Sequence, residues 1–414
     1  MSLLSSLLIL IVVARLLGQI FVRINQPAVI GEMLGGILLG PAVLGIVHPT
    51  PSLAGVSDLA VFLVIVAAGL EMRFEDVVAA MKGAGLRVAL LSFFIPFFAG
   101  VGIAMAFELD AMRAIFLGLC ISITALPVAA KILENLGLLN TPIGRYAIAT
   151  AVINDVAAML VLGIVLVLPP QPTFTAVGLA VGDALIKLLV LASVVILFNW
   201  GLGLLEKRGY SVQVIPERLI RWLGPEALFG LVLMFVLLFG SVSEALGFHF
   251  VIGAFFGALL LDKRHFLASR YNELKHTLDS ITGGFLAPVF FAYLGLKFDF
   301  DAIEGWGFVA AVLAVSILSK LLAGWWGGRL LKMERREALA LGSMLNGRGI
   351  MELVVASIAY ERGFIGSHMF STLVLMGVVT TLITPWLVGK ALPKAHLEAY
   401  RARWGEAKVP PPAA

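Results

Sequence analysis

The sequence predicts an all-α polytopic membrane protein with thirteen transmembrane helices and an internal inverted-topology repeat. Three observations support this fold class. Of the 414 residues, 60% are hydrophobic and 14% are charged, with a mean hydropathy of +1.01, which is far more apolar than a soluble protein requires. Apolar windows of bilayer length follow one another along the whole chain. Several short motifs of the first half recur in the second half at a nearly constant spacing.

The apolar windows also predict how the chain is oriented. They fall at 2–22, 27–47, 55–72, 86–107, 111–135, 143–168, 174–201, 225–246, 247–262, 278–298, 305–331, 337–360 and 368–391. With the N-terminus outside, 23 of the 30 lysines and arginines lie on the inner side and three on the outer side. Basic residues concentrate on the cytoplasmic side, so we expect the N-terminus outside and the C-terminus in the cytoplasm. The first window lacks a basic leading segment, and we interpret it as a retained helix.

The recurring motifs divide the chain into two halves. Thr124 and Asn346 each interrupt a hydrophobic window, one in each half. At the same or a similar spacing Val29-Ile30-Gly31 recurs as Val251-Ile252-Gly253, Gly31/Gly35 as Gly253/Gly257, and Gly69-Leu70-Glu71 as Gly295-Leu296-Lys297. Windows 1–6 therefore pair with windows 8–13. Because this offset of seven helices is odd, the second half enters the membrane from the opposite side, as in inverted repeats.

This pairing predicts the domain organisation. Residues 1–168 form the first repeat, and 169–224 supply a connecting seventh helix and a cytoplasmic loop. Residues 225–391 form the second repeat, and 392–414 a short cytoplasmic tail.

Two discontinuous helices are expected to cross where the hydrophobic windows are interrupted. The first break comprises Thr124, Ala125, Leu126 and Pro127, and the second comprises Gly347 and Gly349 around Arg348. Thr124 offers a hydroxyl, and Pro127 suits the first turn of a resumed helix. In secondary transporters, breaks of this kind bring backbone carbonyls and helix dipoles to the substrate site.

Asp155 is the clearest candidate for chemistry. It lies inside the apolar run 147–160, where an ionisable side chain costs at least about 2.5–3.5 kcal/mol. Burial disfavours the ionised form of a carboxyl. Such a carboxyl can hold a proton or a metal cation but hardly both, and that competition is sufficient for exchange. We therefore predict cation and proton binding by Asp155, Asn154 and Thr124, with the transported cation held by Asp155 and Thr124, and we expect Asn154 to hydrogen-bond a helix break.

Other charged residues are predicted to compensate charge, with simpler explanations left open. Arg348 and Glu352 lie one turn apart, so they either form a local ion pair or balance the dipoles of the breaks. Lys297 and Glu71 occupy corresponding places near helix ends, where long side chains can also reach the membrane interface. Lys320 has no sequence-local partner, and the sequence assigns it no role.

The chain also resembles a known family. Thr124-Ala-Leu-Pro127, Gly144-Arg145 and Asn154-Asp155 are similar to motifs of the monovalent cation:proton antiporter superfamily. The similarity is to its second branch, which includes bacterial potassium-efflux and sodium/proton antiporters and plant cation/proton exchangers. Phe290 to Lys297 and Asn346 to Glu352 look like the later motifs.

The resemblance implies a function and a mechanism. It implies a dimerisation domain, a mobile core domain with crossed helix breaks at Thr124 and Gly347, and an elevator movement during which Asp155 alternately carries cation and proton. Electrogenic relatives have two acidic residues and a lysine on the tenth helix, whereas electroneutral relatives have Asn-Asp and an arginine on the penultimate helix. This chain combines Asn154, Lys297 and Arg348, and Ala125 stands where the electroneutral branch has an acidic residue. We predict electroneutral exchange of one Na⁺ or K⁺ for one H⁺.

Other functions were weighed. A sodium-coupled symporter of an organic anion would use the same fold, with Arg348 anchoring the anion. A channel should show a polar stripe through its pore, and none is evident. We expect no enzymatic activity, since there is no nucleophile–base pair, and no cofactor. The expected partners are Na⁺ or K⁺, H⁺, membrane lipids and a second copy of the chain, without nucleic acid. The expected location is a bacterial inner membrane, with a role in pH homeostasis.

Overall fold

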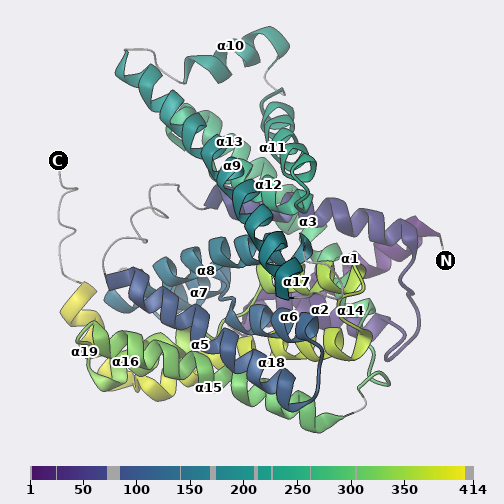
Figure 1. Ribbon diagram of the computed structural model, residues 1–414, viewed down its shortest axis with the longest axis vertical. Helices are drawn as coiled ribbons and strands as arrows, with labels where there is room; N and C mark the ends of the chain where they lie inside the picture. The colour runs from purple at the N-terminus through teal and green to yellow at the C-terminus, as the bar shows by residue number, and fades with distance from the viewer. Residues whose placement is uncertain are drawn as a thin grey trace. The chain divides into compact units, whose positions relative to one another are not determined.

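The computed structural model describes residues 2–24, 26–71, 84–139, 141–167, 174–208, 213–224, 227–261, 263–303 and 305–405 (Figure 1). Within these ranges every regular element is a helix. Nine of the helices described there are long and apolar enough to cross a membrane, and three shorter ones are also apolar. The predicted class, an all-helical protein with many membrane-spanning segments, is confirmed at this level.

The helices group into two compact units. The first unit comprises Met1–Ile11, Pro49–Val78 and Met159–Tyr293, and the second comprises Val12–His48, Ala79–Ala158 and Leu294–Ala414. Each unit therefore draws on both predicted repeats.

In the first unit the elements are α3 (Pro51–Glu71), α9 (Phe174–Lys207), α10 (Val214–Leu223), α11 (Ala227–Ala245), α12 (Phe250–Leu259), η1 (Lys263–His265), α13 (Ala268–Ile281) and η2 (Thr282–Leu286). In the second they are α2 (Ala28–Leu39), α5 (Ala84–Ala106), α6 (Ala111–Ser122), α7 (Leu126–Asn135), α15 (Trp306–Leu330), α16 (Arg335–Met344), α17 (Ile350–Glu361), α18 (Ser367–Ala391) and α19 (Lys394–Gly405). Three helices have residues in both units: α1 (Leu3–Arg23), α8 (Pro142–Val167) and α14 (Ala287–Leu296).

Two predicted windows each resolve into a pair of helices. In window 111–135, α6 ends at Ser122 and α7 begins at Leu126. The intervening Ile123 (φ −67°, ψ 145°) and Ala125 (φ −78°, ψ 119°) are extended, and the Ser122 hydroxyl donates 2.7 Å back to the Leu119 carbonyl. In window 337–360, α16 ends at Met344 and α17 begins at Ile350. Both interruptions lie where the sequence placed them.

Window 278–298 captures only part of a longer helix. Helices α13 and α14 are joined by the π-helical turn η2, so that Ala268–Leu296 forms one helical segment of 29 residues. The first half of this segment is polar, so the predicted apolar window began at residue 278 and missed the start of the helix at Ala268. The π turn contains Gly283 and Gly284, and such turns are usually confined to a single turn within an α-helix.

Glycines allow close helix packing in the second unit, and the same contact occurs twice. A Cβ added to Gly118 of α6 would lie 2.6 Å from the carbonyl oxygen of Phe97 on α5. A Cβ added to Gly342 of α16 would lie 2.6 Å from the carbonyl oxygen of Leu321 on α15. The spacing from Phe97 to Leu321 in the chain equals that from Gly118 to Gly342. Small residues of this kind let helix backbones approach in a membrane.

A second contact also recurs. In the second unit, a side chain at Gly31 of α2 would collide with the Leu17 carbonyl of α1. In the first unit, a side chain at Gly253 of α12 would collide with the Phe239 carbonyl of α11. The spacing from Leu17 to Phe239 along the chain equals that from Gly31 to Gly253. The recurrence of the two glycines was already evident from the sequence motifs.

Helix α19 fixes the ends of neighbouring helices in the second unit. Tyr400 is buried beside Leu138 and Ile143, its hydroxyl accepts a 3.3 Å hydrogen bond from the Ile143 backbone, and burial raises its pKa to about 12. The Arg401 Nε donates 2.7 Å to the Leu136 carbonyl at the end of α7. These contacts hold the start of α8, the helix that carries Asn154 and Asp155. Residues 406–414 of the predicted tail lie outside the described ranges.

The packing of α15 on α16 predicts the effect of adding one methyl group. In Gly324→Ala the new Cβ would collide with Gly342, so we expect overpacking to reduce the free energy of unfolding by about 1–3 kcal/mol. Thermal unfolding of the purified protein in detergent, followed by tryptophan fluorescence, measures the change.

Gly307→Ala is the matched control on the same helix. A Cβ at Gly307 meets no atom within 4 Å, so alanine should be neutral or raise stability by up to about 1 kcal/mol. Equal unfolding temperatures for the two variants would contradict the close packing of α15 on α16.

Candidate functional site

The two helix breaks are hydrogen-bonded to each other. The backbone N–H of Ala125 donates to the carbonyl of Gly347 at 3.0 Å, and the Thr124 hydroxyl donates to the carbonyl of Leu345 at 3.1 Å. Thr124 and Ala125 are fully buried. A Cβ at Gly349 would lie only 2.8 Å from that of Ala125, so close approach needs a glycine there. Gly347 has only ordinary contacts at its Cβ position, with Val128 3.4 Å away.

Arg348 binds the C-terminal end of α6. Its Nη1 donates to the carbonyls of Cys120 at 2.6 Å and Ile123 at 2.8 Å, and its Nη2 donates to the hydroxyl of Ser316 at 2.8 Å. The last carbonyls of a helix lack intrahelical donors and carry partial negative charge. Here a buried guanidinium supplies both the donors and the opposite charge. The contacts thus place Arg348 where it can compensate a helix end.

Lys320 on α15 binds the same helix end. The fully buried ammonium donates to the Ser122 carbonyl, to the Ser92 carbonyl at 3.1 Å and to the Thr124 hydroxyl at 2.8 Å. Sequence reasoning assigned this residue no role. The only signal was a lysine in the middle of an apolar window, since its partners lie at least 196 residues away in the chain.

Asn154 hydrogen-bonds the first break, as expected. Its Nδ2 donates to the Ser122 carbonyl and the Thr124 hydroxyl, each at 3.4 Å, and lies 3.2 Å from the hydroxyl of Ser92. Asn154 is fully buried near the middle of α8. This amide therefore connects α8, α5 and the break between α6 and α7.

Asp155, the next residue of α8, is only 3% exposed. Its Oδ1 accepts no hydrogen bond from any residue that the structure describes. Lys320 is the charged group that acts on it electrostatically. A buried carboxyl oxygen with no donor is costly unless the carboxyl is protonated or a cation approaches it. The geometry gives Asp155 the capacity to bind either.

Arg348 and Glu352 form the expected pair. Arg348 Nε lies 3.7 Å from Glu352 Oε2, and both side chains are almost completely buried. Glu352 is in the first turn of α17, where a carboxylate interacts favourably with the helix dipole. The backbone of Arg348 is fixed by the Thr381 hydroxyl, which accepts from its N–H at 3.0 Å and donates to its carbonyl at 3.1 Å.

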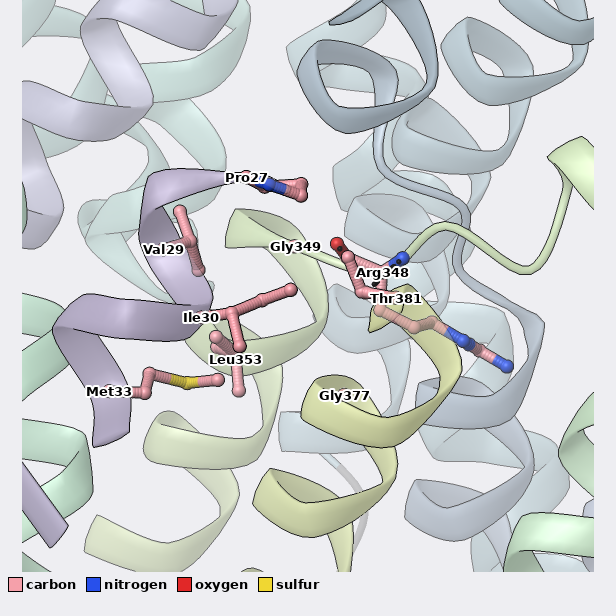
Figure 2. A pocket seen from close by; sticks show the side chains of 9 residues that line it. All are labelled: Pro27, Val29, Ile30, Met33, Arg348, Gly349, Leu353, Gly377 and Thr381. Atoms are coloured by element: carbon pink, nitrogen blue, oxygen red, sulfur yellow. Dashed lines mark hydrogen bonds between the residues drawn. The ribbon is translucent and has the colours of Figure 1, made fainter. Parts of the chain in front are cut away.

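A small cavity lies beside this pair, with space for about one water molecule. Its lining comprises Pro27, Val29, Ile30, Met33, Arg348, Gly349, Leu353, Gly377 and Thr381 from α2, α17, α18 and adjoining residues. Figure 2 shows the Arg348 side chain pointing away from Ile30 and Met33, so the guanidinium does not enter this cavity.

The remaining predicted site residues lie at the breaks or apart from them. Leu126 begins α7, and Pro127 follows it, with its side chain outside the described part. Lys297 follows the end of α14, and its ammonium pairs with Glu361 at 2.8 Å. The lysine at the breaks is Lys320, one helix later. Glu71 ends α3, and its side chain is outside the described part.

Residues 7–390 match the family described as "Sodium/hydrogen exchanger, transmembrane". The chain belongs to this family. The resemblance to cation:proton antiporters is therefore confirmed. A protein similar to this chain is "Na(+)/H(+) antiporter NhaS4" of Synechocystis sp., 29% identical over 94% of this chain and 97% of its own length. Another is "Cation/H(+) antiporter 18" of Arabidopsis thaliana, 32% identical over 91% of this chain.

The chain spans 47% of the length of that plant relative. Its fold is similar to the solved structure of the sodium proton antiporter MjNhaP1 from Methanocaldococcus jannaschii, with a TM-score of 0.68 and 16% identity over 95% of this chain and 97% of that one. These relatives all carry antiporter names, and the comparisons give no support to the organic-anion symporter.

The buried ion pair predicts a test by double mutation. Arg348→Gln leaves Glu352 buried without its cation, so we expect the free energy of unfolding to fall by about 3–5 kcal/mol. Arg348→Gln/Glu352→Gln removes both charges and should recover part of this loss. Unfolding of the purified variants in denaturant measures both.

Arg362→Gln serves as the control, because Arg362 is exposed at the other end of α17 and its loss should change stability little. A double variant no more stable than Arg348→Gln would mean that the two buried charges are not coupled.

Proposed function

We propose that this protein is a secondary active antiporter that exchanges Na⁺ or K⁺ for H⁺ across a membrane, with Asp155 as the shared binding group. The single observation that carries the proposal is the Asp155 carboxyl: it is buried, it follows Asn154, which hydrogen-bonds the first break, and one of its oxygens has no donor among the described residues. Family membership and the antiporter names of the relatives support the substrate class.

Exchange follows from competition at one carboxyl. When Asp155 is protonated it carries no charge for a cation to neutralise, and when a cation is bound there is no room for the proton. One pH unit corresponds to about 1.4 kcal/mol, which can sustain roughly a tenfold cation gradient in one-for-one exchange. Asn154 and Thr124 complete the polar wall of the proposed site.

The contacts of Lys320 favour electroneutral exchange. A lysine ammonium has three N–H donors, and Lys320 has three oxygen partners: the carbonyls of Ser92 and Ser122 and the hydroxyl of Thr124. Carbonyl oxygens can only accept hydrogen bonds. If the Lys320 ammonium lost a proton, the lone pair on its Nζ would face one of these oxygens. Lys320 therefore keeps its charge through the cycle, and Asp155 alone exchanges one proton for one cation.

The finer architecture belongs to the same proposal. We propose thirteen membrane-spanning helices, counting each broken pair once, in inverted repeats at 1–168 and 225–391. The connecting segment 169–224 and the tail 392–414 complete the chain. The glycine contacts that recur at equal spacing in the two halves support this symmetry. In the elevator mechanism, the second unit, which contains both breaks and Asp155, moves as the core.

The proposed setting is a bacterial inner membrane, with the N-terminus outside, the C-terminus in the cytoplasm and a homodimer as the assembled form. The distribution of 23 basic residues inside and three outside supports the orientation. Membrane lipids are the expected surroundings of the apolar helices, and pH homeostasis is the expected role.

Asp155→Asn tests the central claim. An amide of the same shape can neither release a proton nor neutralise a cation, so we expect proton movement driven by a Na⁺ or K⁺ gradient to vanish in proteoliposomes. A pH-sensitive dye inside the vesicles reports it. Asp183→Asn is the control, because Asp183 is half exposed and pairs with Lys187 at 2.6 Å, so transport should persist. Cation-driven proton movement by Asp155→Asn would refute the mechanism.

Electroneutrality predicts the electrical behaviour of the wild-type protein. On a solid-supported membrane, a jump in Na⁺ or K⁺ concentration should produce no sustained charge movement, although the dye assay reports turnover. A Lys320 that releases a proton in each cycle would instead move one net charge per cation, and a transport current would then be recorded.

A further inference from the structure

We infer that Asn346, in the second helix break, supplies a neutral oxygen ligand to the transported cation and helps to determine which alkali cation is preferred. This inference rests on the proposed function and extends it to a residue of the second repeat. Asn346 is fully buried, and its Oδ1 accepts no hydrogen bond within the described chain.

The orientation of the amide is fixed by its other end. Asn346 Nδ2 donates 3.2 Å to the carbonyl of Gly342 in α16. A carbonyl can only accept, so the atom facing Gly342 is the nitrogen, and the atom turned away is the oxygen. Asn154 is held in the same way by the carbonyl of Ser122, which also leaves its Oδ1 without a donor in the described chain.

The first break contacts Asn154 and the residues on either side of Asn346. Leu345 and Gly347, the neighbours of Asn346, accept hydrogen bonds from Thr124 and Ala125. Asn154 Nδ2 is 3.4 Å from the Thr124 hydroxyl, and Asp155 is the next residue. Asn154, Asp155 and Asn346 each have an oxygen that no described residue donates to, and Asn154 and both chain neighbours of Asn346 contact the first break.

Not every bare buried oxygen at the breaks has the same meaning. Those of Glu352 belong to a carboxylate already 3.7 Å from the Arg348 guanidinium, and the hydroxyl of Thr150, which lies in α8, can itself act as a donor. Amide and carboxylate oxygens without hydrogens can only accept. Such a set, with one charged and two neutral oxygens, suits a dehydrated alkali cation, because oxygen ligands must replace its water shell.

A proton needs one oxygen of Asp155, whereas a cation needs several ligands. Removing the Asn346 oxygen should therefore weaken cation binding and alter the preference among cations. A residue that only supports the break would, when replaced, reduce stability or turnover for all cations alike. Selectivity thus distinguishes a ligand from a structural support.

The test uses the whole chain in proteoliposomes, with the half-saturating concentrations of Na⁺, K⁺ and Li⁺ measured at fixed pH. For Asn346→Ala we expect half-saturation for the preferred cation to rise about tenfold or more, the scale on which supporting groups act at metal sites. The ratio of half-saturation for Na⁺ to that for K⁺ should change. Asn346→Asp retains an oxygen at the position and should retain cation affinity.

Ser343→Ala is the matched control. Ser343 is buried and lies three residues before Asn346, and its hydroxyl donates a 2.8 Å hydrogen bond to the Leu339 carbonyl. Cation selectivity should therefore be unchanged in Ser343→Ala. Wild-type half-saturation and selectivity in Asn346→Ala would overturn the inference, and the proposed antiport would stand provided that Asp155→Asn is inactive. If Asn346→Ala cannot be purified, Asn346→Asp provides the test. The inference would be overturned as well if this variant bound every cation more weakly by the same factor.

Discussion

The end of α6 in the interior of the protein is the constraint on which the site depends. Four carbonyls at the end of any helix lack intrahelical donors, and inside a membrane there is no water to satisfy them. Here the carbonyls of Cys120, Ser122 and Ile123 receive hydrogen bonds from two basic side chains, Arg348 and Lys320. A neutral side chain could satisfy the hydrogen bonds but not the dipole, and a single cation could not reach all three.

In the proposed mechanism Arg348 and Lys320 keep their charges, and only Asp155 changes its charge. Arg348 is tied to two carbonyls, a serine hydroxyl and Glu352, and Lys320 is tied to three oxygens. Within the described chain, Asp155 has only an electrostatic partner and one oxygen with no donor. In the proposed mechanism the charge of Lys320 favours an ionised Asp155, and the missing donor favours neutralisation of this carboxylate by a proton or a cation.

The two broken helices pack against their neighbours through the same kind of glycine contact. The glycine contact of α5 with α6 recurs between α15 and α16, and Ser92 and Ser316 on these helices are related by the same spacing in the chain. Ser92 contacts Asn154 and Lys320, which both hydrogen-bond the first break, and Ser316 contacts Arg348 of the second. The two serines thus occupy corresponding positions in the two halves of the chain. The charged residues of the halves differ: the first has Asp155, and the second has Arg348 and Glu352.

The sequence alone determined the helical membrane fold and the positions of both breaks, and it singled out Asp155 as a candidate, because hydrophobic periodicity and a charge within an apolar run are local signals. It also indicated the Arg348–Glu352 pair, which lies within one helical turn. Only the tertiary structure assigned Lys320 to the breaks and Lys297 to Glu361, since these partners lie 64 or more residues apart. The free amide oxygen of Asn346 was likewise decided by folding, because which atom is left without a donor depends on what the rest of the chain brings near.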